Sequence, residues 1–431
     1  MNTNKQTIAF KTFGCKLNFS ETSEISRQIS TQGFDVVANT ESADIYIIHS
    51  CTVTALAEKK ARQTIRHFKR LNPDAKIGVI GCYAQLRGDE LLQLPNVDFI
   101  AGNETKYNLA ELLSENKEKP SHSDDEAHTS YHGAFSLNDR TRSFLKVQDG
   151  CDYFCTYCAV AFARGRSRSD SIANTLLQAE KIAKSEVKEI VLTGVNVGDF
   201  GKERNETLFD LLCEIEKVDG IDRIRLSSIE PNLLENRIIN LVAQSNKIMP
   251  HFHIPLQSGN NRLLSMMKRR YKRELFKEKV DYIKHLMPNA CIAADVIVGF
   301  PTETEEEFTD TLNFINDLDI SYLHVFTYSD RPGTKSADIK EKVPQHEKHE
   351  RSKRLHALSE QKRDAFYHKN KGNSSAVLFE EQHEGYIYGW TENYIRVKAP
   401  ETEVAHNEIR NVTLLNIDPA DGVYLIDVNN D

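Results

Sequence analysis

The sequence CDYFCTYC, from Cys151 to Cys158, carries three cysteines in one short stretch. It directly follows a strand-like run, SFLKVQDG, so the thiols stand in a loop at the carboxyl end of a predicted strand. An iron–sulfur cluster usually takes four cysteines, and no fourth lies nearby, so one iron would keep an open position, as catalytic metals do. Zinc is the alternative, but it would need a fourth His or Cys close by, and none is evident.

More strand-like segments follow on the carboxyl side of this loop. They are EIVLTGV, RIRLSSI, HFHIPLQ, CIAADVIVGF and YLHVFTY, each separated from the next by enough residues for a helix. Repeated strand–helix units predict parallel strands covered by helices. Together with SFLKVQDG they predict a partial TIM-type barrel, in a domain that we expect to span residues 136–368. Its last part, residues 343–372, is highly charged and predicts a long exposed helix.

Strands and helices also alternate ahead of the loop. The short apolar runs IAFKTFG, ADIYIIHS and KIGVIG are separated by helical patterns, which predicts a doubly wound parallel sheet over residues 5–118. The polar stretch from Ser114 to Ser130 suits a linker. At the other end, residues 371–431 look all-β, with strands at SAVLFEE, GYIYGW, NYIRVKA and GVYLIDV, and predict a small barrel or sandwich. The fold class is therefore α/β with a small all-β domain.

The overall composition is that of a globular protein without a membrane span. The chain has 431 residues, 39% of them hydrophobic and 27% charged. No stretch approaches the roughly 18 apolar residues that a membrane helix needs, and the first residues show no secretory signal. We therefore expect a cytoplasmic protein. The formal net charge of −8 argues against a protein that simply coats nucleic acid. The negative charge is concentrated in residues 372–431, which hold three Lys and Arg against eleven Asp and Glu. The rest of the chain is therefore balanced in charge and can form basic patches.

Three further cysteines each follow a predicted strand of the amino-terminal domain. Cys15 comes after IAFKTFG, Cys51 after ADIYIIHS and Cys82 after KIGVIG. Because ligands of such sheets bind outside the carboxyl ends of the strands, the three thiols could converge on one crevice and hold a second cluster. Alternatively, they are buried cysteines packed as small apolar groups. Cys213 and Cys291 fit that second description better than a ligand role.

At CDYFCTYC the sequence resembles the radical S-adenosylmethionine (SAM) enzymes, and GCKLN, HSCTVT and IGCYAQ narrow the resemblance to the methylthiotransferases. The resemblance covers nearly the whole chain, and it implies a radical SAM core followed by a TRAM-like barrel at residues 371–431. It also implies two 4Fe–4S clusters, one on Cys151, Cys155 and Cys158 that binds and cleaves SAM, and an auxiliary one on Cys15, Cys51 and Cys82 that delivers sulfur.

Three branches of this family compete. GCKLN with Lys16, IGCYAQ and ARGRSRS are most similar to the MtaB branch, which places a methylthio group on carbon 2 of N6-threonylcarbamoyladenosine at tRNA position 37. The MiaB branch modifies isopentenyladenosine at that position, and the RimO branch modifies an aspartate of a ribosomal protein. Two departures from the family pattern are His49, where Asn is usual, and Ala161, where Pro is common; neither removes a cysteine.

The resemblance also implies where SAM binds. Contacts are expected at the carboxyl ends of the barrel strands, where barrel active sites lie. The candidates are Tyr157, Thr193, Gly194, Asn196, Ser228, Glu230, Gln257 and Ser258, with Gly299 and Phe300 lining the adenine. Each polar residue alone is about as well explained by a turn or a helix cap.

Arginines just past the cysteine loop are candidates for tRNA contacts. Arg164, Arg166 and Arg168 suit phosphates and base stacking, and two further basic runs lie at residues 268–273 and 59–70. The target base of the anticodon loop would be splayed out to reach the barrel. The expected partners are tRNA, an electron donor such as flavodoxin or ferredoxin, and a sulfur source, with no membrane. A non-catalytic iron–sulfur redox protein is the alternative of another class, but it would need no SAM site and no basic patches.

Overall fold

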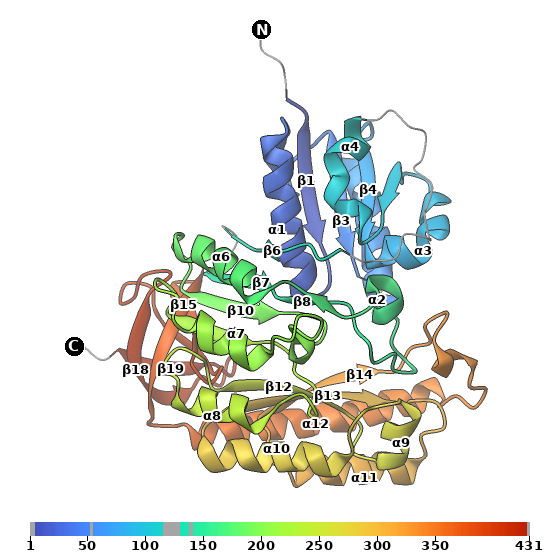
Figure 1. Ribbon diagram of the computed structural model, residues 1–431. Coiled ribbons are helices and arrows are strands. Elements are labelled where there is room, and N and C mark those ends of the chain that lie inside the picture. The colour runs from blue at the N-terminus through green and yellow to red at the C-terminus, as the bar shows by residue number, and fades with distance from the viewer. Residues whose placement is uncertain (1–4, 52–54, 115–129, 138–140, 429–431) are drawn as a thin grey trace.

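The computed structural model describes residues 5–51, 55–114, 130–137 and 141–428. Residues 115–129 of the predicted linker and the Thr52–Thr54 part of HSCTVT therefore lie outside the described residues. The chain forms an amino-terminal α/β domain, a central partial barrel and a small carboxyl-terminal β-barrel, as the colours of Figure 1 show. This confirms the predicted fold class.

The amino-terminal domain is a five-stranded parallel sheet with helices on both faces. Its strands run in the order β2-β1-β3-β4-β5. Residues of α2 and α3 pack on one face with Tyr46 and Val79, and those of α1 and α4 pack on the other with Ile8 and Ile47. The elements are β1 (Thr7–Thr12), α1 (Lys16–Thr31), β2 (Asp35–Val37), β3 (Ile45–Ser50), α2 (Ala55–Leu71), β4 (Lys76–Gly81), α3 (Cys82–Leu92), β5 (Phe99–Ala101), the 3-10 helix η1 (Thr105–Asn108) and α4 (Leu109–Ser114).

The central domain is an open barrel of parallel strands, with the two-residue strand β6 antiparallel to β7 at one edge. One sheet has the order β11-β10-β7-β6 and another the order β12-β13-β14, and two isolated parallel bridges, Ile224 to Ile248 and Ser228 to His253, join them. The strands are β6 (Ala134–Phe135), β7 (Arg142–Lys146), β10 (Glu189–Thr193), β11 (Arg223–Leu226), β12 (His251–Gln257), β13 (Cys291–Val298) and β14 (Tyr322–Thr327), with the short pair β8 (Gln148–Asp149) and β9 (Arg168–Ser169) beside them.

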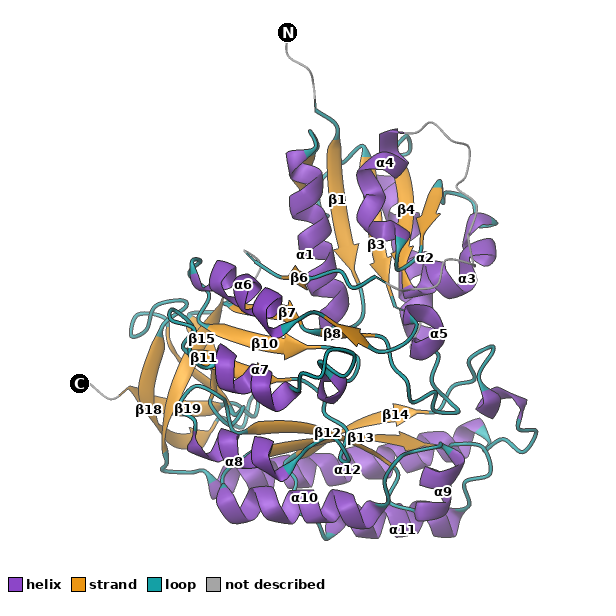
Figure 2. Ribbon diagram, in the orientation of Figure 1, coloured by secondary structure: helices purple, strands orange, loops and turns teal. Residues whose placement is uncertain are grey.

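Helices cover the outer face of this barrel, as Figure 2 shows. They are α6 (Ile172–Ala183), α7 (Leu208–Ile215), α8 (Asn236–Gln244), α9 (Asn261–Met266), α10 (Arg273–Leu286) and α11 (Glu305–Asn316), while the short α5 (Val160–Arg164) follows the cysteine loop. The core under these helices is formed by outward-facing strand residues, which alternate with inward-facing neighbours; examples are Ile190, Leu226, Ile254 and Ala294. The intervening residues, such as Glu189, Arg225 and His253, therefore face the inside of the barrel.

Helix α1 closes the open edge of the barrel. It contacts β6 and β7, and the ring of Phe19 on α1 lies 6.4 Å from the ring of Phe144 on β7. In Figure 1 the amino-terminal sheet accordingly stands directly above β6 and β7. The helix thus brings the carboxyl ends of β1, β3 and β4 to the mouth of the barrel.

Two expectations for the last part of the chain were incomplete. Helix α12 (Gln345–Lys369) is not simply exposed, because it packs on β14 and buries Leu355, Leu358 and Phe366; its apolar residues are few and widely spaced among charges. The carboxyl-terminal barrel has five strands rather than four: β15 (Ser374–His383), β16 (Tyr386–Thr391), β17 (Arg396–Pro400), β18 (Ile409–Ile417) and β19 (Tyr424–Val428). Strand β18 was missed because it buries only Val412 and Leu414.

No helix among the described residues is long and apolar enough to cross a membrane.

Candidate functional site

The three amino-terminal cysteines lie at one edge of the sheet. Cys15, Cys51 and Cys82 follow β1, β3 and β4, which are neighbours in the sheet, so their carboxyl ends meet at the same edge. The thiols of Cys15 and Cys82 are close enough for their charges to interact. A methyl group placed on Gly14 would lie 2.5 Å from Cβ and 3.3 Å from Sγ of Cys51. The convergence expected from the sequence is thus present.

Polar side chains surround these thiols. Asn103 donates from Nδ2 to Sγ of Cys82 at 3.5 Å, and Sγ of Cys15 lies 3.7 Å from Oδ1 of Asn18. Cys51 and Cys82 are buried, whereas Cys15 is exposed. His49 is fully buried next to this edge, with Nδ1 2.8 Å from the Thr22 hydroxyl. Burial lowers the pKa of His49 well below its usual value, so the imidazole is neutral.

The loop CDYFCTYC gathers its three thiols in the same way. Backbone N–H groups of Tyr153 and Val160 donate to the sulfurs of Cys151 and Cys158, both at 3.4 Å. The guanidinium of Arg269 donates to Cys155 at 3.2 Å. All of these donors favour thiolates, which are the form that binds metal.

Burial opposes the ionisation of these thiols when no metal is bound. It raises the pKa of Cys151 to about 12 and that of Cys158 to about 11, in part through the neighbouring thiols. Iron cations would reverse this penalty by pairing with the thiolates. The other two described cysteines, Cys213 on α7 and Cys291 on β13, belong to different parts of the fold. Each group of three therefore fits an iron–sulfur cluster with one open iron position.

Arg269 is a functional candidate that the sequence analysis assigned only to a surface basic run. Its side chain is 3% exposed and pairs with Glu230, and Nη1 lies 3.4 Å from the Tyr157 hydroxyl as well as near Cys155. Burial raises the pKa of Glu230, against the opposing effect of Arg269. Tyr157 and Glu230, both predicted from the sequence, therefore meet at the cysteine loop around a cation.

Gln148 is a second residue that was missed. Its Oε1 accepts from the backbone N–H of Asn196 at 2.8 Å, and its Nε2 donates to the carbonyl of Gly150 at 2.8 Å. It thus ties the predicted SAM-binding segment Thr193–Asn196 to the start of the cysteine loop. The Asn196 side chain donates to Asp199 and its buried Oδ1 has no hydrogen-bond partner among the described residues.

Other predicted SAM contacts are placed less favourably. The Thr193 hydroxyl donates to its own strand at Val191, and the Ser258 hydroxyl lies 3.3 Å from that of Thr311 on α11. Phe300 is fully buried beside Tyr328, so the expectation that it lines an adenine is not supported. Gly299 lies next to it, against the stem of Lys348.

Two predicted contacts lie at the carboxyl ends of neighbouring barrel strands, Ser228 just after β11 and Gln257 as the last residue of β12. Ser228 forms an isolated parallel β-bridge with His253 on β12. Gln257 adopts a φ of 65°, just after the register of β12 against β13 shifts between Pro255 and Gln257. Such a bulge turns a side chain away from the regular alternation.

Two of the three predicted RNA-binding arginines are buried, which corrects their interpretation. Arg164 is 2% exposed and Arg168 is 7% exposed. Arg164 forms two 3.0 Å hydrogen bonds to the carboxylate of Glu21 and one of 3.0 Å to Asp149, while Arg168 lies 3.3 Å from Asp149. A side chain enclosed and paired in this way is not available to phosphates.

These arginines belong to a buried charge network between the two α/β domains. Glu21 also accepts from Lys106 at 2.6 Å and from Lys146 at 2.9 Å, and Lys146 lies 2.8 Å from Asp149. Burial alone would raise the pKa of Glu21, but Arg164, Lys106 and Lys146 hold it well below its usual value. The network consists of Glu21, Lys106, Lys146, Asp149, Arg164 and Arg168.

Arg166, by contrast, is on the surface beside the cysteine loop. Its side chain is 78% exposed, and its guanidinium lies 5.6 Å from the ring centre of Phe154. Phe154 in turn makes an edge-to-face contact with Phe162, and both phenylalanines are exposed. An exposed cation with two exposed rings is the kind of surface on which nucleic-acid bases stack.

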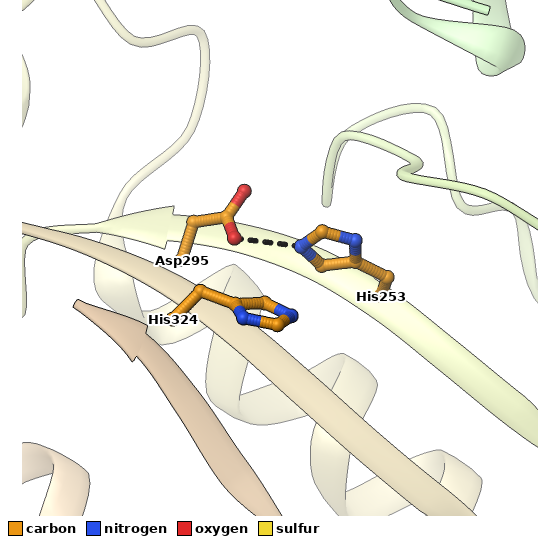
Figure 3. Close-up of side chains that lie close together, drawn as sticks. All are labelled: His253, Asp295 and His324. Atoms are coloured by element: carbon orange, nitrogen blue, oxygen red, sulfur yellow. Dashed lines mark hydrogen bonds and ion pairs between the residues drawn. The ribbon is translucent and has the colours of Figure 1, made fainter. Parts of the chain in front are cut away.

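The inner wall of the barrel carries a further polar group, drawn in Figure 3. His253 on β12 and Asp295 on β13 form a 2.7 Å hydrogen bond, and the imidazole of His324 on β14 lies 5.1 Å from that of His253. The potential ligand atoms lie within 4.8 Å of one another. Two histidines and a carboxylate have the composition of a divalent metal site, but Lys16 lies near the His324 ring and its positive charge opposes a cation.

Gly150 is the tightest glycine near the site, and Gly150→Ala should lower the iron content. Gly150 has a φ of 70°, and an added Cβ would lie 1.9 Å from the Arg166 carbonyl oxygen. Backbone strain alone costs about 1–3 kcal/mol, and the clash with a fixed backbone adds to it. Iron per chain after anaerobic reconstitution measures the effect. Gly422→Ala is the control, since Gly422 has a φ of 69° and nothing within 4 Å; an equal effect of both changes would contradict the role of the clash.

Two family descriptions match parts of this chain. Residues 7–102 match an "Uncharacterized protein family UPF0004", and residues 145–315 match the "Radical SAM superfamily". Among solved structures, the radical SAM methyltransferase TsrM from Kitasatospora setae covers 77% of this chain and 75% of its own, with a TM-score of 0.58. At 15% identity this likeness concerns the fold alone.

Curated relatives are similar over almost the full chain. A protein of Aquifex aeolicus named "Threonylcarbamoyladenosine tRNA methylthiotransferase MtaB" is 39% identical over 91% of this chain and 96% of its own length. A protein of the same name from Bacillus subtilis is 37% identical over 95% and 94%. A "tRNA-2-methylthio-N(6)-dimethylallyladenosine synthase" of Bdellovibrio bacteriovorus is 32% identical over 86% and 84%.

Proposed function

This chain belongs to the radical SAM methylthiotransferases, in their MtaB branch, and we propose that it replaces the hydrogen on carbon 2 of N6-threonylcarbamoyladenosine in tRNA with a methylthio group. The protein is thus an enzyme that inserts sulfur and transfers a methyl group. The observation that carries this proposal is the presence of two separate groups of three cysteines, each at the carboxyl ends of parallel strands and brought toward each other by α1.

We propose one 4Fe–4S cluster for each group of cysteines. When bound, the clusters and SAM supply the radical and sulfur chemistry that an unactivated aromatic C–H bond requires. The contribution of the chain is to bind and to orient. Arg269 places a buried positive charge at Cys155 and beside Glu230 and Tyr157, which suits the carboxylate of SAM. Gln148 holds the Thr193–Asn196 segment against the loop.

Further partners follow from this chemistry. The cleavage of SAM needs an electron, which we assign to a donor such as flavodoxin or ferredoxin, and the product needs a sulfur source. For tRNA we assign a contact to Arg166, because it is exposed with Phe154 beside the loop. The tRNA anticodon loop would present position 37 to the barrel mouth, and we place the reaction in the cytoplasm, where tRNA is modified.

Deleting the gene should remove 2-methylthio-N6-threonylcarbamoyladenosine from tRNA and leave its precursor in its place. Nucleoside mass spectrometry of bulk tRNA measures both compounds, and the precursor should rise by the amount that the product falls. A plasmid copy restores the product, whereas a copy with Cys155→Ala does not.

The second candidate substrate is isopentenyladenosine, supported by relatives named for dimethylallyladenosine at lower identity. Loss of 2-methylthio-isopentenyladenosine in the deletion strain, with the threonylcarbamoyl product unchanged, would replace the proposed substrate by this one.

A further inference from the structure

Lys16 points into the barrel although it belongs to the amino-terminal domain. It is the first residue of α1, and Phe19 lies three residues later on the same face of the helix. Phe19 packs on Phe144, which sits on the inner face of β7, since its neighbour Leu145 faces the outer core. Lys16 therefore extends along the inner face of the barrel, directly after Cys15.

The groups close enough to Lys16 for their charges to interact with it agree with the position that the Phe19–Phe144 contact gives. They lie on five barrel strands: Arg142 on β7, Glu189 on β10, Arg225 on β11, His251 on β12 and His324 on β14. Only a position inside the barrel is close to all five strands.

Lys16 has no partner of opposite charge there. Within the described ranges, its ammonium makes no hydrogen bond or ion pair. Glu189 already pairs with Arg225 at 3.0 Å, and Asp295 is held by His253. His324 is exposed and lies beside His253 and Asp295 in Figure 3, and it likewise forms no hydrogen bond with any described residue. The barrel thus presents an uncompensated positive charge and a free imidazole to a ligand.

We propose that Lys16 pairs with the carboxylate of the threonylcarbamoyl substituent and that His324 contacts its polar atoms, which makes Lys16 a determinant of substrate choice. This inference rests on the proposed function. The threonyl group carries a carboxylate, whereas an isopentenyl group is apolar and neutral. Carbon 2 and carbon 6 of adenine flank the same ring nitrogen, so the group that recognises the N6 substituent must lie near the cysteines that deliver sulfur. Lys16 lies next to Cys15 in the chain.

The test uses the reconstituted full-length enzyme and two RNAs. One is an anticodon stem-loop with threonylcarbamoyladenosine, and the other carries the same base with its carboxylate converted to a neutral methylamide. Dissociation constants by fluorescence anisotropy and kcat/KM are measured for the wild type, Lys16→Met, Lys16→Arg and Lys76→Met. Lys76 is the matched control, since it is exposed at the opposite end of β4 from Cys82.

The carboxylate RNA should bind about 10- to 100-fold more weakly to Lys16→Met than to the wild type, the range for a charged hydrogen bond. The methylamide RNA should bind both equally, Lys16→Arg should retain most of the preference, and Lys76→Met should match the wild type. Because both RNAs meet the same enzyme, any change in cluster content cancels in their ratio. An unchanged preference in Lys16→Met, or an equal loss for both RNAs, overturns the assignment of Lys16.

The proposed function fails in a different way. If the wild type converts neither RNA but converts a stem-loop with isopentenyladenosine, the substrate itself is wrong. If the wild type binds the carboxylate RNA only when a divalent cation is added, His253, Asp295 and His324 form a metal site and the role of His324 is wrong.

Discussion

Replacing Cys155 by alanine is expected to abolish the cleavage of SAM, and with it all methylthiolated product. Cys155 is buried between the other thiols of its loop and accepts a hydrogen bond from Arg269. Two thiolates cannot hold a cluster that needs three, so the loop would lose its iron. Iron per chain should fall by about half, because each of the two proposed clusters contains the same amount. Cleavage is measured as 5′-deoxyadenosine formed after chemical reduction.

Cys51→Ala should also lower the iron content by about half, but it should leave the cleavage of SAM intact. The product would lack the sulfur, because the affected thiol belongs to the group at the edge of the amino-terminal sheet. Cys213→Ala is the control for cysteine removal, since Cys213 lies half-buried on α7. Methylthiolated product from Cys51→Ala, or loss of SAM cleavage in that variant alone, would contradict the division of roles.

Glu21→Gln is expected to destabilise the contact between the two α/β domains by about 3–5 kcal/mol, the cost of breaking a buried ion pair. Glu21 is fully buried and binds Lys106, Lys146 and Arg164. Its loss leaves Lys146, Arg164 and Arg168 to share the single carboxylate of Asp149, and leaves Lys106 without a carboxylate partner among the described residues. Urea denaturation measures the loss of stability, and hydrogen exchange of the native protein shows whether that loss lies in α1 and β7.

The control lies one turn away on the same helix. Glu24 is partly exposed and pairs with Arg27, so Glu24→Gln should change stability by less than about 1 kcal/mol. The pKa of Glu21 is held well below its usual value, so its contribution is complete at neutral pH and is lost only as the pH falls through that lowered pKa. Equal stability of both variants at pH 7 would show that the network does not hold the domains together.

Much of the site could be predicted because strand ends are visible in the sequence. A short apolar run followed by cysteine places the thiol at the carboxyl end of a strand, and parallel strands bring such ends to one edge. The branch of the family was also predicted correctly. Strand β18 and the packed face of α12 were missed, because their apolar residues are too few or too widely spaced to produce a clear period.

The roles of the arginines could not be predicted in this way. Arg164 and Arg166 stand two residues apart in ARGRSRS, yet one is enclosed by Glu21 and Asp149 and the other is exposed on Phe154. Arg269 lies in a run of basic residues but is buried against Cys155 and Glu230. Partners more than a hundred residues away decide the two buried cases, Glu21 for Arg164 and Cys155 for Arg269.

By itself, the sequence determined the α/β architecture, the two cysteine triplets and the family, because these depend on local periodicity and on residues that stand at strand ends. Only the tertiary structure decided what the charged side chains do. A charge is stable inside a protein only when opposite charges or hydrogen bonds compensate for the lost water. Here that compensation comes from the other domain, because Glu21 on α1 pairs with Arg164 after the loop CDYFCTYC. Lys16 on the same helix lacks such a partner among the described residues, and we therefore assign its compensation to a ligand.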